Sequence, residues 1–319
     1  SGLPDKTIQE QIKSETVAIL PTDFRGIKPK LIVKEGDNVK IGSPLFFNKV
    51  NPDIKWGSPA CGTVKTIKYG PRRVIQKIEI QLSDSQESEK NKKYKNSEII
   101  GLDREVAIDT ILGANIFPFF RQRPFNIIPD PKVIPRDIFV SAINTAPLAF
   151  DQEVVIKENL DSFQAGVDAL NTLTSGKVYL TSKTGSVVSS IQNVEAYTID
   201  GPHPAGNVGI QIHHISHLKP GENVWTINSQ DVITIGKLFL RGIYDPTRVI
   251  TLAGPCIKEP GHFRVNAGAK ISTITNGRMI DNEKRIISGD VLTGRGTSHE
   301  DFLSFYDYSI SVISDEVKR

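Results

Sequence analysis

Apolar and polar residues alternate in short runs near the N-terminus, and this pattern predicts an all-β unit. Between residues 31 and 82 the runs are separated by turn residues such as Gly36-Asp37 and Gly42-Ser43-Pro44. Ile78 and Ile80 alternate with polar residues, as in a strand that buries one face. No helical spacing occurs in this stretch, so we expect a small β-domain over residues 1–98.

The composition changes between Ser83 and Ser97, where apolar residues almost disappear. Such a segment buries too little apolar surface to form a core, so we expect a linker. Its charged residues include four lysines, Lys90, Lys92, Lys93 and Lys95, which we expect to be solvated.

The middle of the chain has the pattern of an α/β domain, which we place at residues 99–245. Residues 137–143 and 177–180 are strand-like, and between them Leu160, Phe163, Val167 and Leu170 recur at helical spacing, with Gly176 as the expected C-terminal cap. Strand, helix and strand in this order predict a βαβ unit with a parallel sheet, hence a Rossmann-like domain. We further expect helices over 103–115 and 231–240 and strands over 193–199 and 223–227.

Strand patterns return after Pro246, so a third, β-rich domain is expected over residues 246–319. Its predicted strands cover residues 248–252, 261–265 and 268–272. Ser1-Gly2 is typical of a tag remnant, and residues 316–319 close no element. We therefore expect the chain to be a fragment of a longer protein.

The composition is that of a soluble globular protein, with 38% hydrophobic and 24% charged residues. No apolar run approaches the roughly 20 residues that a membrane-spanning helix needs, and no signal peptide is recognisable. The net charge of +3 is small, so nucleic acid is not an expected partner. The two cysteines, Cys61 and Cys256, are too few to hold an iron–sulfur cluster, and their rarity suits a reducing compartment.

Motifs for catalysis are missing from the sequence. It contains no GxGxxG, Walker A or GxSxG pattern, so we expect neither a nucleotide site nor a nucleophile triad, and no catalytic residue. The turns around Gly42 and Gly62 resemble those of the biotinyl/lipoyl barrel-sandwich fold. Lys49 and Lys55 lie between the two halves of that pattern but lack the flanking residues of a modified lysine, so we expect an unmodified scaffold.

Histidines gather after the loop Asp200-Gly-Pro-His-Pro-Ala-Gly206. His213 and His217 have the i, i+4 spacing of metal ligands, but no acidic residue lies nearby as a third ligand, so we expect no metal site. His203 stands between two prolines. The loop either holds it against a small molecule or merely forms a tight turn.

Seven short motifs occur in the same order as in one family, the A subunits of the sodium-pumping NADH:quinone oxidoreductases. The chain resembles this family over nearly its whole length. The motifs are Leu102–Val106, Arg121–Phe125, Asp200–Gly206, Gln230–Ile233, Gly236–Leu240, Leu252–Pro255 and Ile287–Gly294.

The resemblance implies a peripheral protein on the cytoplasmic face of the bacterial inner membrane. The complex oxidises NADH, reduces ubiquinone or another quinone and pumps Na+, and its other subunits, the expected partners, carry the flavins and the iron centre. The A subunit is related to the flavoprotein subunit of complex I but holds no cofactor, so the isolated chain should be inactive. The third domain would be a β-grasp domain of the soluble-ligand-binding type. The alternatives are a free-standing small-ligand-binding protein that uses this β-grasp domain and a carrier enzyme with a modified lysine.

The family has been implicated in quinone binding, and the segment Phe117–Phe125 offers suitable groups. A quinone head group needs apolar or aromatic walls and hydrogen-bond donors for its carbonyl oxygens. We expect Phe119, Phe120 and Phe125 as walls, Arg123 as a charged donor and His203 as a second donor. The alternative is that the phenylalanines only pack at a domain interface.

Overall fold

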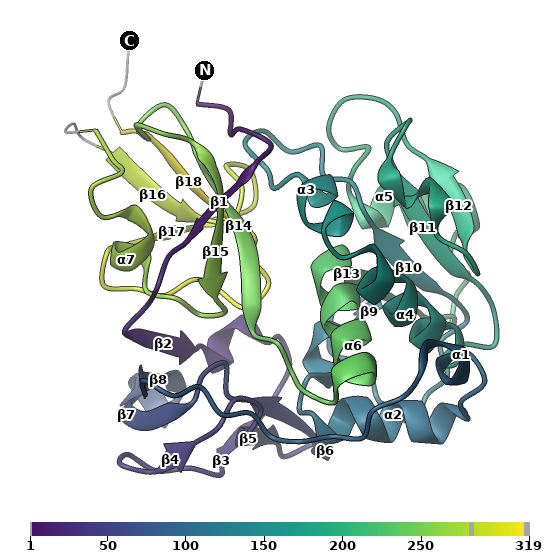
Figure 1. The fold of residues 1–319 in the computed structure, drawn as a ribbon, viewed down its shortest axis with the longest axis horizontal. Helices are drawn as coiled ribbons and strands as arrows, with labels where there is room; N and C mark the ends of the chain where they lie inside the picture. The colour runs from purple at the N-terminus through teal and green to yellow at the C-terminus, as the bar shows by residue number, and fades with distance from the viewer. Residues whose placement is uncertain (1, 281–283, 316–319) are drawn as a thin grey trace.

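The computed structural model describes residues 2–280 and 284–315, which form four sheets and the helices around them (Figure 1). The predicted chain end at 316–319 and the first residue of the expected tag remnant lie outside the described residues. The boundaries at residues 98 and 245 remain our proposal for the division of the chain.

The N-terminal unit is built from two small sheets, as the alternating pattern predicted. One contains four strands in the order β2 (Thr16–Ile19), β8 (Ile75–Leu82), β7 (Gly62–Tyr69) and β4 (Asn38–Val39). The other contains β3 (Pro29–Leu31), β5 (Pro44–Asn48) and β6 (Asn51–Gly57). The rings of Phe46 and Trp56 stack in the core at 4.5 Å. Two short 3-10 turns, η1 (Pro21–Asp23) and η2 (Pro71–Arg73), complete the unit.

The expected linker is exposed at its lysines but is held against the next unit. Asn91 N donates to Gly242 O at 2.8 Å, and Tyr94 N donates to Phe239 O at 2.9 Å. The Tyr94 side chain is buried. The segment is therefore anchored to the C-terminal end of α6 (Ser229–Arg241) by backbone hydrogen bonds and one aromatic residue.

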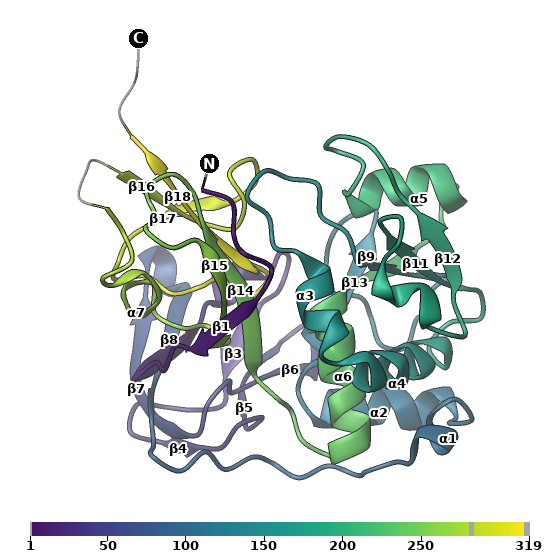
Figure 2. The same cartoon turned by 45° about the horizontal axis from the view of Figure 1, so that its top comes forward.

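The α/β unit confirms the predicted parallel sheet. Its strand order is β12 (Glu195–Thr198), β11 (Val178–Ser182), β10 (Ile138–Ser141), β13 (Val224–Asn228) and β9 (Arg121–Arg123), and only β9 is antiparallel to its neighbour. Helices α3 (Gln152–Lys157), α4 (Leu160–Asn171) and α6 lie on one side and α5 (Val208–Ser216) on the other (Figure 2). The remaining turns and helices are α1 (Asn96–Ile99), α2 (Arg104–Gly113), η3 (Phe117–Phe119) and η4 (Val187–Ser190).

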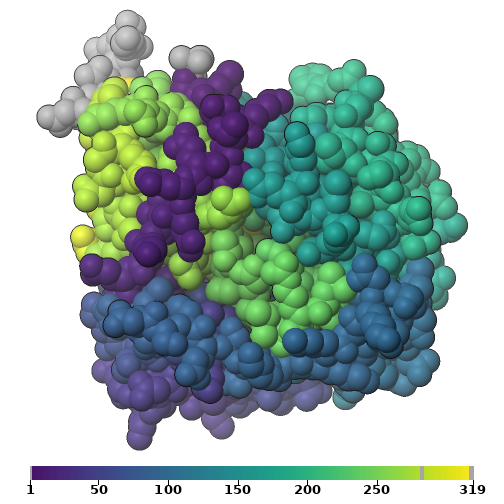
Figure 3. Space-filling model, in the orientation of Figure 1, coloured from purple at the N-terminus to yellow at the C-terminus, as the bar shows by residue number. Residues whose placement is uncertain are grey.

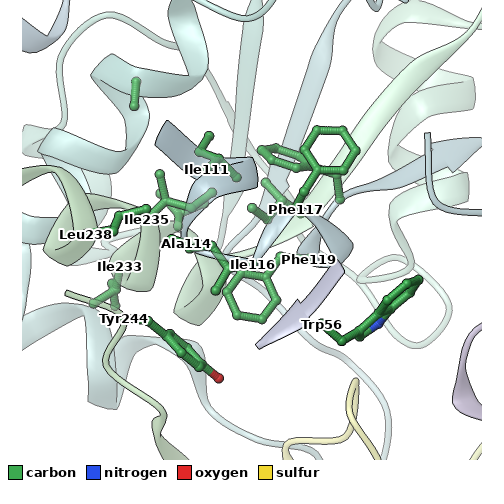
Figure 4. Close-up of a cluster of buried hydrophobic side chains, with 14 of the residues drawn as sticks. Trp56, Ile111, Ala114, Ile116, Phe117, Phe119, Ile233, Ile235, Leu238 and Tyr244 are labelled. Atoms are coloured by element: carbon green, nitrogen blue, oxygen red, sulfur yellow. The ribbon is translucent and has the colours of Figure 1, made fainter. Parts of the chain in front are cut away.

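Alternation along β10 explains why both faces of this sheet are covered. Val140 belongs to the main core with α4 and α6, whereas Phe139 packs with Ile212 of α5 and Val224 of β13. The main core continues from the α/β unit to Trp56 of the N-terminal unit, and Phe117, Phe119 and Tyr244 belong to the same cluster (Figure 4).

The C-terminal unit is a six-stranded sheet in the order β1 (Ile8–Gln11), β15 (Gly261–Asn266), β14 (Thr247–Ala253), β18 (Ser309–Ser314), β16 (Lys284–Ser288) and β17 (Arg295–Thr297). The described chain thus begins in this sheet: β1 pairs in parallel with β15, although the sequence pattern gave it to the first domain.

Two local predictions were wrong. Residues 268–272 were expected as a strand, but Gly268 has a φ of +68° and the chain turns into the short helix α7 (Ile271–Thr275). Gly176 was expected to cap α4, but that helix ends at Asn171 with Thr172 as its cap. Gly176 is instead close to the neighbouring backbone, because a Cβ there would stand 2.0 Å from Arg136 O.

Candidate functional site

A cavity of about 650 Å³ opens at the carboxyl ends of β10 and β13. From β10 the chain runs outward through β11 and β12, and then returns by way of α5 to β13 on the opposite side of β10. The direction of winding therefore reverses between β10 and β13. Open α/β sheets bind ligands in the crevice at such a reversal, and we call this space the switch-point cavity.

Two arginines of β9 supply positive charge to the switch-point cavity. Arg121 donates from Nη2 to Asn126 O at 2.9 Å, and its guanidinium lies 4.1 Å from the Tyr306 ring centroid. The Arg123 side chain has neither an ion pair nor a hydrogen bond to any described residue, and its Nε is buried. Burial, and then the charge of Arg121, lower the pKa of Arg123. Such an unpaired cation favours a ligand with oxygen acceptors.

The floor of the switch-point cavity is a buried ionic network. Asp231 of α6 accepts a hydrogen bond from Arg248 Nη1 at 2.5 Å and another from the Tyr308 hydroxyl at 2.7 Å. Burial raises the pKa of Tyr308 well above its usual value, so the phenol keeps its proton. Burial alone would lower the pKa of Arg248, but the neighbouring Asp231 carboxylate raises this pKa above its usual value. The network is internally neutralised and leaves the charge of Arg123 uncompensated.

The loop before α5 closes one side of the switch-point cavity. His203 Nδ1 lies 3.3 Å from Thr145 Oγ1, and Gly206 N donates to the same oxygen at 2.9 Å. A Cβ on Gly206 would stand 2.6 Å from Thr145 N, so this close approach requires glycine. The first turn of α5 follows directly and lines the space.

Of the five residues predicted to hold a quinone, the structure brings three to this cavity: Phe119, Arg123 and His203. Phe119 is almost fully buried beneath it. Phe120 is fully buried elsewhere, against Phe117 and Trp225, with ring centroids at 5.4 and 5.2 Å. Phe125 is 65% exposed and lines no part of the cavity.

Sequence reasoning missed most of the polar lining. Asn144 lies three residues after the end of β10, and Asn228 is the last residue of β13. Polar residues at the carboxyl ends of parallel strands are a usable signal for a ligand site. Arg121 begins the motif Arg121–Phe125, but the sequence pattern did not indicate a role for it. Tyr306 and Tyr308 come from the C-terminal unit, and no local pattern connects them with β10 or β13.

The other candidate groups lie apart from this cavity. His213 lies on α5, and His217 follows its last residue. Within the described ranges no three His, Cys, Asp or Glu side chains are grouped as metal ligands. Lys49 lies at the exposed turn between β5 and β6, where its N donates to Lys28 O at 2.8 Å, and Lys55 lies in β6.

None of the helices that the structure describes has both the length and the apolar character to span a bilayer.

Three family models match the chain. Residues 1–83 match the NqrA N-terminal barrel-sandwich hybrid domain, residues 102–244 the NqrA second alpha/beta domain and residues 249–299 the NQRA C-terminal domain. These matches, with the sheets described above, confirm the predicted multidomain α/β architecture, with its barrel-sandwich unit, Rossmann-like domain and β-grasp domain.

Relatives align over the whole chain. The Na(+)-translocating NADH-quinone reductase A subunit of Marinomonas sp. (strain MWYL1) is 37% identical over 320 residues, which cover 100% of this chain and 72% of that protein. The protein of the same name from Saccharophagus degradans is 38% identical over 316 residues, 98% of this chain and 70% of that protein. An NAD+-reducing [NiFe]-hydrogenase in the H2-reduced state has a TM-score of 0.45 at 10% identity, covering 70% of this chain and 48% of that one. On the family models and these two alignments, this chain belongs to the NqrA family, the A subunits of the Na+-translocating NADH-quinone reductases.

Proposed function

We propose that the chain acts as the A subunit of a complex that oxidises NADH, reduces a quinone and moves Na+ across a membrane. Identity of 37–38% along the whole chain to proteins of that name carries this proposal. The other subunits of the complex are its partners. A tagged chain purified from gently solubilised membranes should bring down membrane-embedded subunits, and recovery of the tagged chain alone would contradict the assignment.

In this role the chain holds no redox cofactor of its own. A dinucleotide or flavin phosphate needs a glycine-rich turn that lets its oxygens reach backbone N–H groups. The segment after β10 is Asn144-Thr145-Ala146-Pro147, which contains no glycine. The flavins and the iron centre would therefore lie on other subunits, and the isolated chain would be inactive. We place the chain on the cytoplasmic face of the bacterial inner membrane.

We further propose that the switch-point cavity contributes to quinone binding. Arg123 would donate to one quinone carbonyl, Phe119 would supply part of the wall and His203 would provide a second polar contact across the cavity. The supporting observation is Arg123, which lines the cavity and has no acidic partner among the described residues. Phe120 and Phe125 have no place in this arrangement.

Replacement of Arg123 tests the quinone proposal in the assembled complex. Loss of a charge-assisted hydrogen bond costs about 1.5–3 kcal/mol, so Arg123→Ala should raise the apparent dissociation constant for a quinone or quinone-analogue inhibitor roughly 10- to 100-fold. Arg72→Ala, at an exposed turn of the N-terminal unit, is the matched control. An Arg123→Ala complex that assembles and keeps its quinone affinity would remove Arg123 from the site.

A further inference from the structure

A second cavity, of about 290 Å³, lies where the first residues of the described chain cross between the C-terminal and the α/β units. Figure 3 shows this N-terminal segment, in purple, along the boundary of the two units. The cavity is lined by four segments that are distant in sequence: residues 3–6, the loop from Ala142 to Gln152, Lys183 after β11, and His262 of β15. Neither the sequence motifs nor the proposed quinone site uses it. We call it the His262 cavity.

His262 lines this cavity and has an unused hydrogen-bonding atom. The residue is fully buried, and its Nδ1 lies 2.6 Å from Asp5 O. A backbone carbonyl can only accept, so Nδ1 carries the proton. Burial lowers the pKa of His262, which keeps the ring neutral and leaves Nε2 as an acceptor. Nε2 is buried and has no partner among residues 2–280 and 284–315.

Two of the residues that line the cavity are cationic, Lys6 and Lys183, and one is anionic, Asp151. Lys6 Nζ and Lys183 Nζ each lie 3.6 Å from Asp151 Oδ2. The other oxygen of Asp151 accepts from Glu153 N at 3.1 Å and so caps α3. Two ammonium groups share one carboxylate that already has a structural role. The side chains of Lys6 and Lys183 are 75% and 41% exposed, so their contacts with Asp151 are loose and can be exchanged for a ligand.

We propose that the His262 cavity binds a small anion that also carries a hydrogen-bond donor, of the hydroxycarboxylate class. The hydroxyl group donates to His262 Nε2, and the carboxylate faces Lys6 and Lys183. The apolar part of such a ligand lies against Phe150, whose ring meets the His262 ring edge-on at 5.5 Å. A space of this size is at the lower limit for ligand pockets, which fits a molecule of few heavy atoms. This site stands independently of the proposed quinone site.

The test compares malate with succinate, which has the same two carboxylates but lacks the hydroxyl. The 319-residue chain, labelled with 15N at its six histidines, is titrated with each compound and followed by NMR. Malate should shift the unprotonated ring nitrogen of His262 and bind roughly tenfold more tightly than succinate, because only malate satisfies the buried acceptor. Equal affinities, an unchanged His262 signal or no binding of either acid would overturn the proposal.

Two variants separate the two halves of the site. Lys183→Gln, at a partly exposed position, should weaken malate and succinate alike, by several-fold. His262→Phe keeps an aromatic ring at this position but removes the Nε2 acceptor, so it should abolish the preference for malate. Lys177→Gln is the matched control, since Lys177 precedes β11 at the end of the strand remote from Lys183 and pairs with Glu195. If Lys177→Gln weakens binding as much as Lys183→Gln, the effect is one of net charge and the site is refuted.

Discussion

Phe120 and Phe125 belong to one short segment but occupy opposite environments. Phe120 is fully buried between Phe117 and Trp225, and Phe125 is exposed. Phe120→Ala should therefore lower the free energy of unfolding by about 3–5 kcal/mol, through lost burial and the cavity left behind. Phe125→Ala should change it by less than about 0.5 kcal/mol. Urea unfolding of both variants measures this contrast, and similar losses for the two would contradict this difference in packing.

The candidate site could be predicted from sequence only where its residues share a local motif. Arg123 was found because it stands among aromatic residues and prolines in a short segment. Tyr308 and Asp231 were not identified from the sequence, because a hydrogen bond between residues 77 positions apart leaves no local pattern. Phe120 was misplaced for a related reason: composition indicates an aromatic cluster, but the backbone decides which ring faces the core.

Helices α4 and α6 of the α/β unit pack closely against each other through glycines. A Cβ on Gly166 would stand 2.1 Å from Val232 O, and one on Gly236 would stand 1.7 Å from Ser162 O. Gly236→Ala should therefore force the helices apart and lower the free energy of unfolding by about 1–3 kcal/mol.

Gly209 in the first turn of α5 provides the control for this prediction. A Cβ there would meet nothing within 4 Å, so Gly209→Ala should be neutral or stabilise the chain by up to about 1 kcal/mol. Thermal unfolding of both variants distinguishes steric contact from helix propensity. A stabilised Gly236→Ala variant would show that the helices can separate without loss.

Most elements were predictable because their burial follows the period of the backbone. The strands at β10, β11 and β13 and helices α4 and α6 carry clear apolar patterns. The failures occurred where a contact with a distant segment decides the structure. β1 is placed by pairing with β15, and Gly176 by the backbone of Arg136.

The switch-point cavity and the His262 cavity share a wall. Ile143, Asn144 and Gln152 line both, and Gln152 Oε1 accepts a hydrogen bond from Ser229 at the start of α6. The loop after β10 therefore separates the switch-point cavity from the His262 cavity. Its position depends on the α/β unit, while the C-terminal unit supplies Tyr306 to one cavity and His262 to the other. Both cavities thus depend on how the units are docked.

Asp23 is a titratable group at the junction of the N-terminal unit with the C-terminal unit. Its Oδ2 accepts from Phe305 N at 2.8 Å, and Arg295 Nη1 lies 3.8 Å from Oδ1. Burial raises the pKa of Asp23 from 3.8 to about 6, while the Phe305 hydrogen bond and Arg295 oppose the rise and Asp307 adds to it. The folded state thus holds a proton on Asp23 at pH values where the unfolded chain has released it.

Asp23 should make the docked structure less stable as the pH rises from about 4 to 6, because the folded state then binds more protons than the unfolded state. Above pH 6 its effect is constant, and the shift corresponds to roughly 3 kcal/mol at most. Asp23→Asn keeps an acceptor for Phe305 N but cannot titrate. In urea unfolding between pH 4 and 7, the variant should gain stability relative to the unmodified chain up to pH 6, whereas the exposed control Asp84→Asn should not. Parallel curves for the unmodified chain and Asp23→Asn would mean that the pKa of Asp23 is the same in the folded and unfolded chains, so that burial does not raise it.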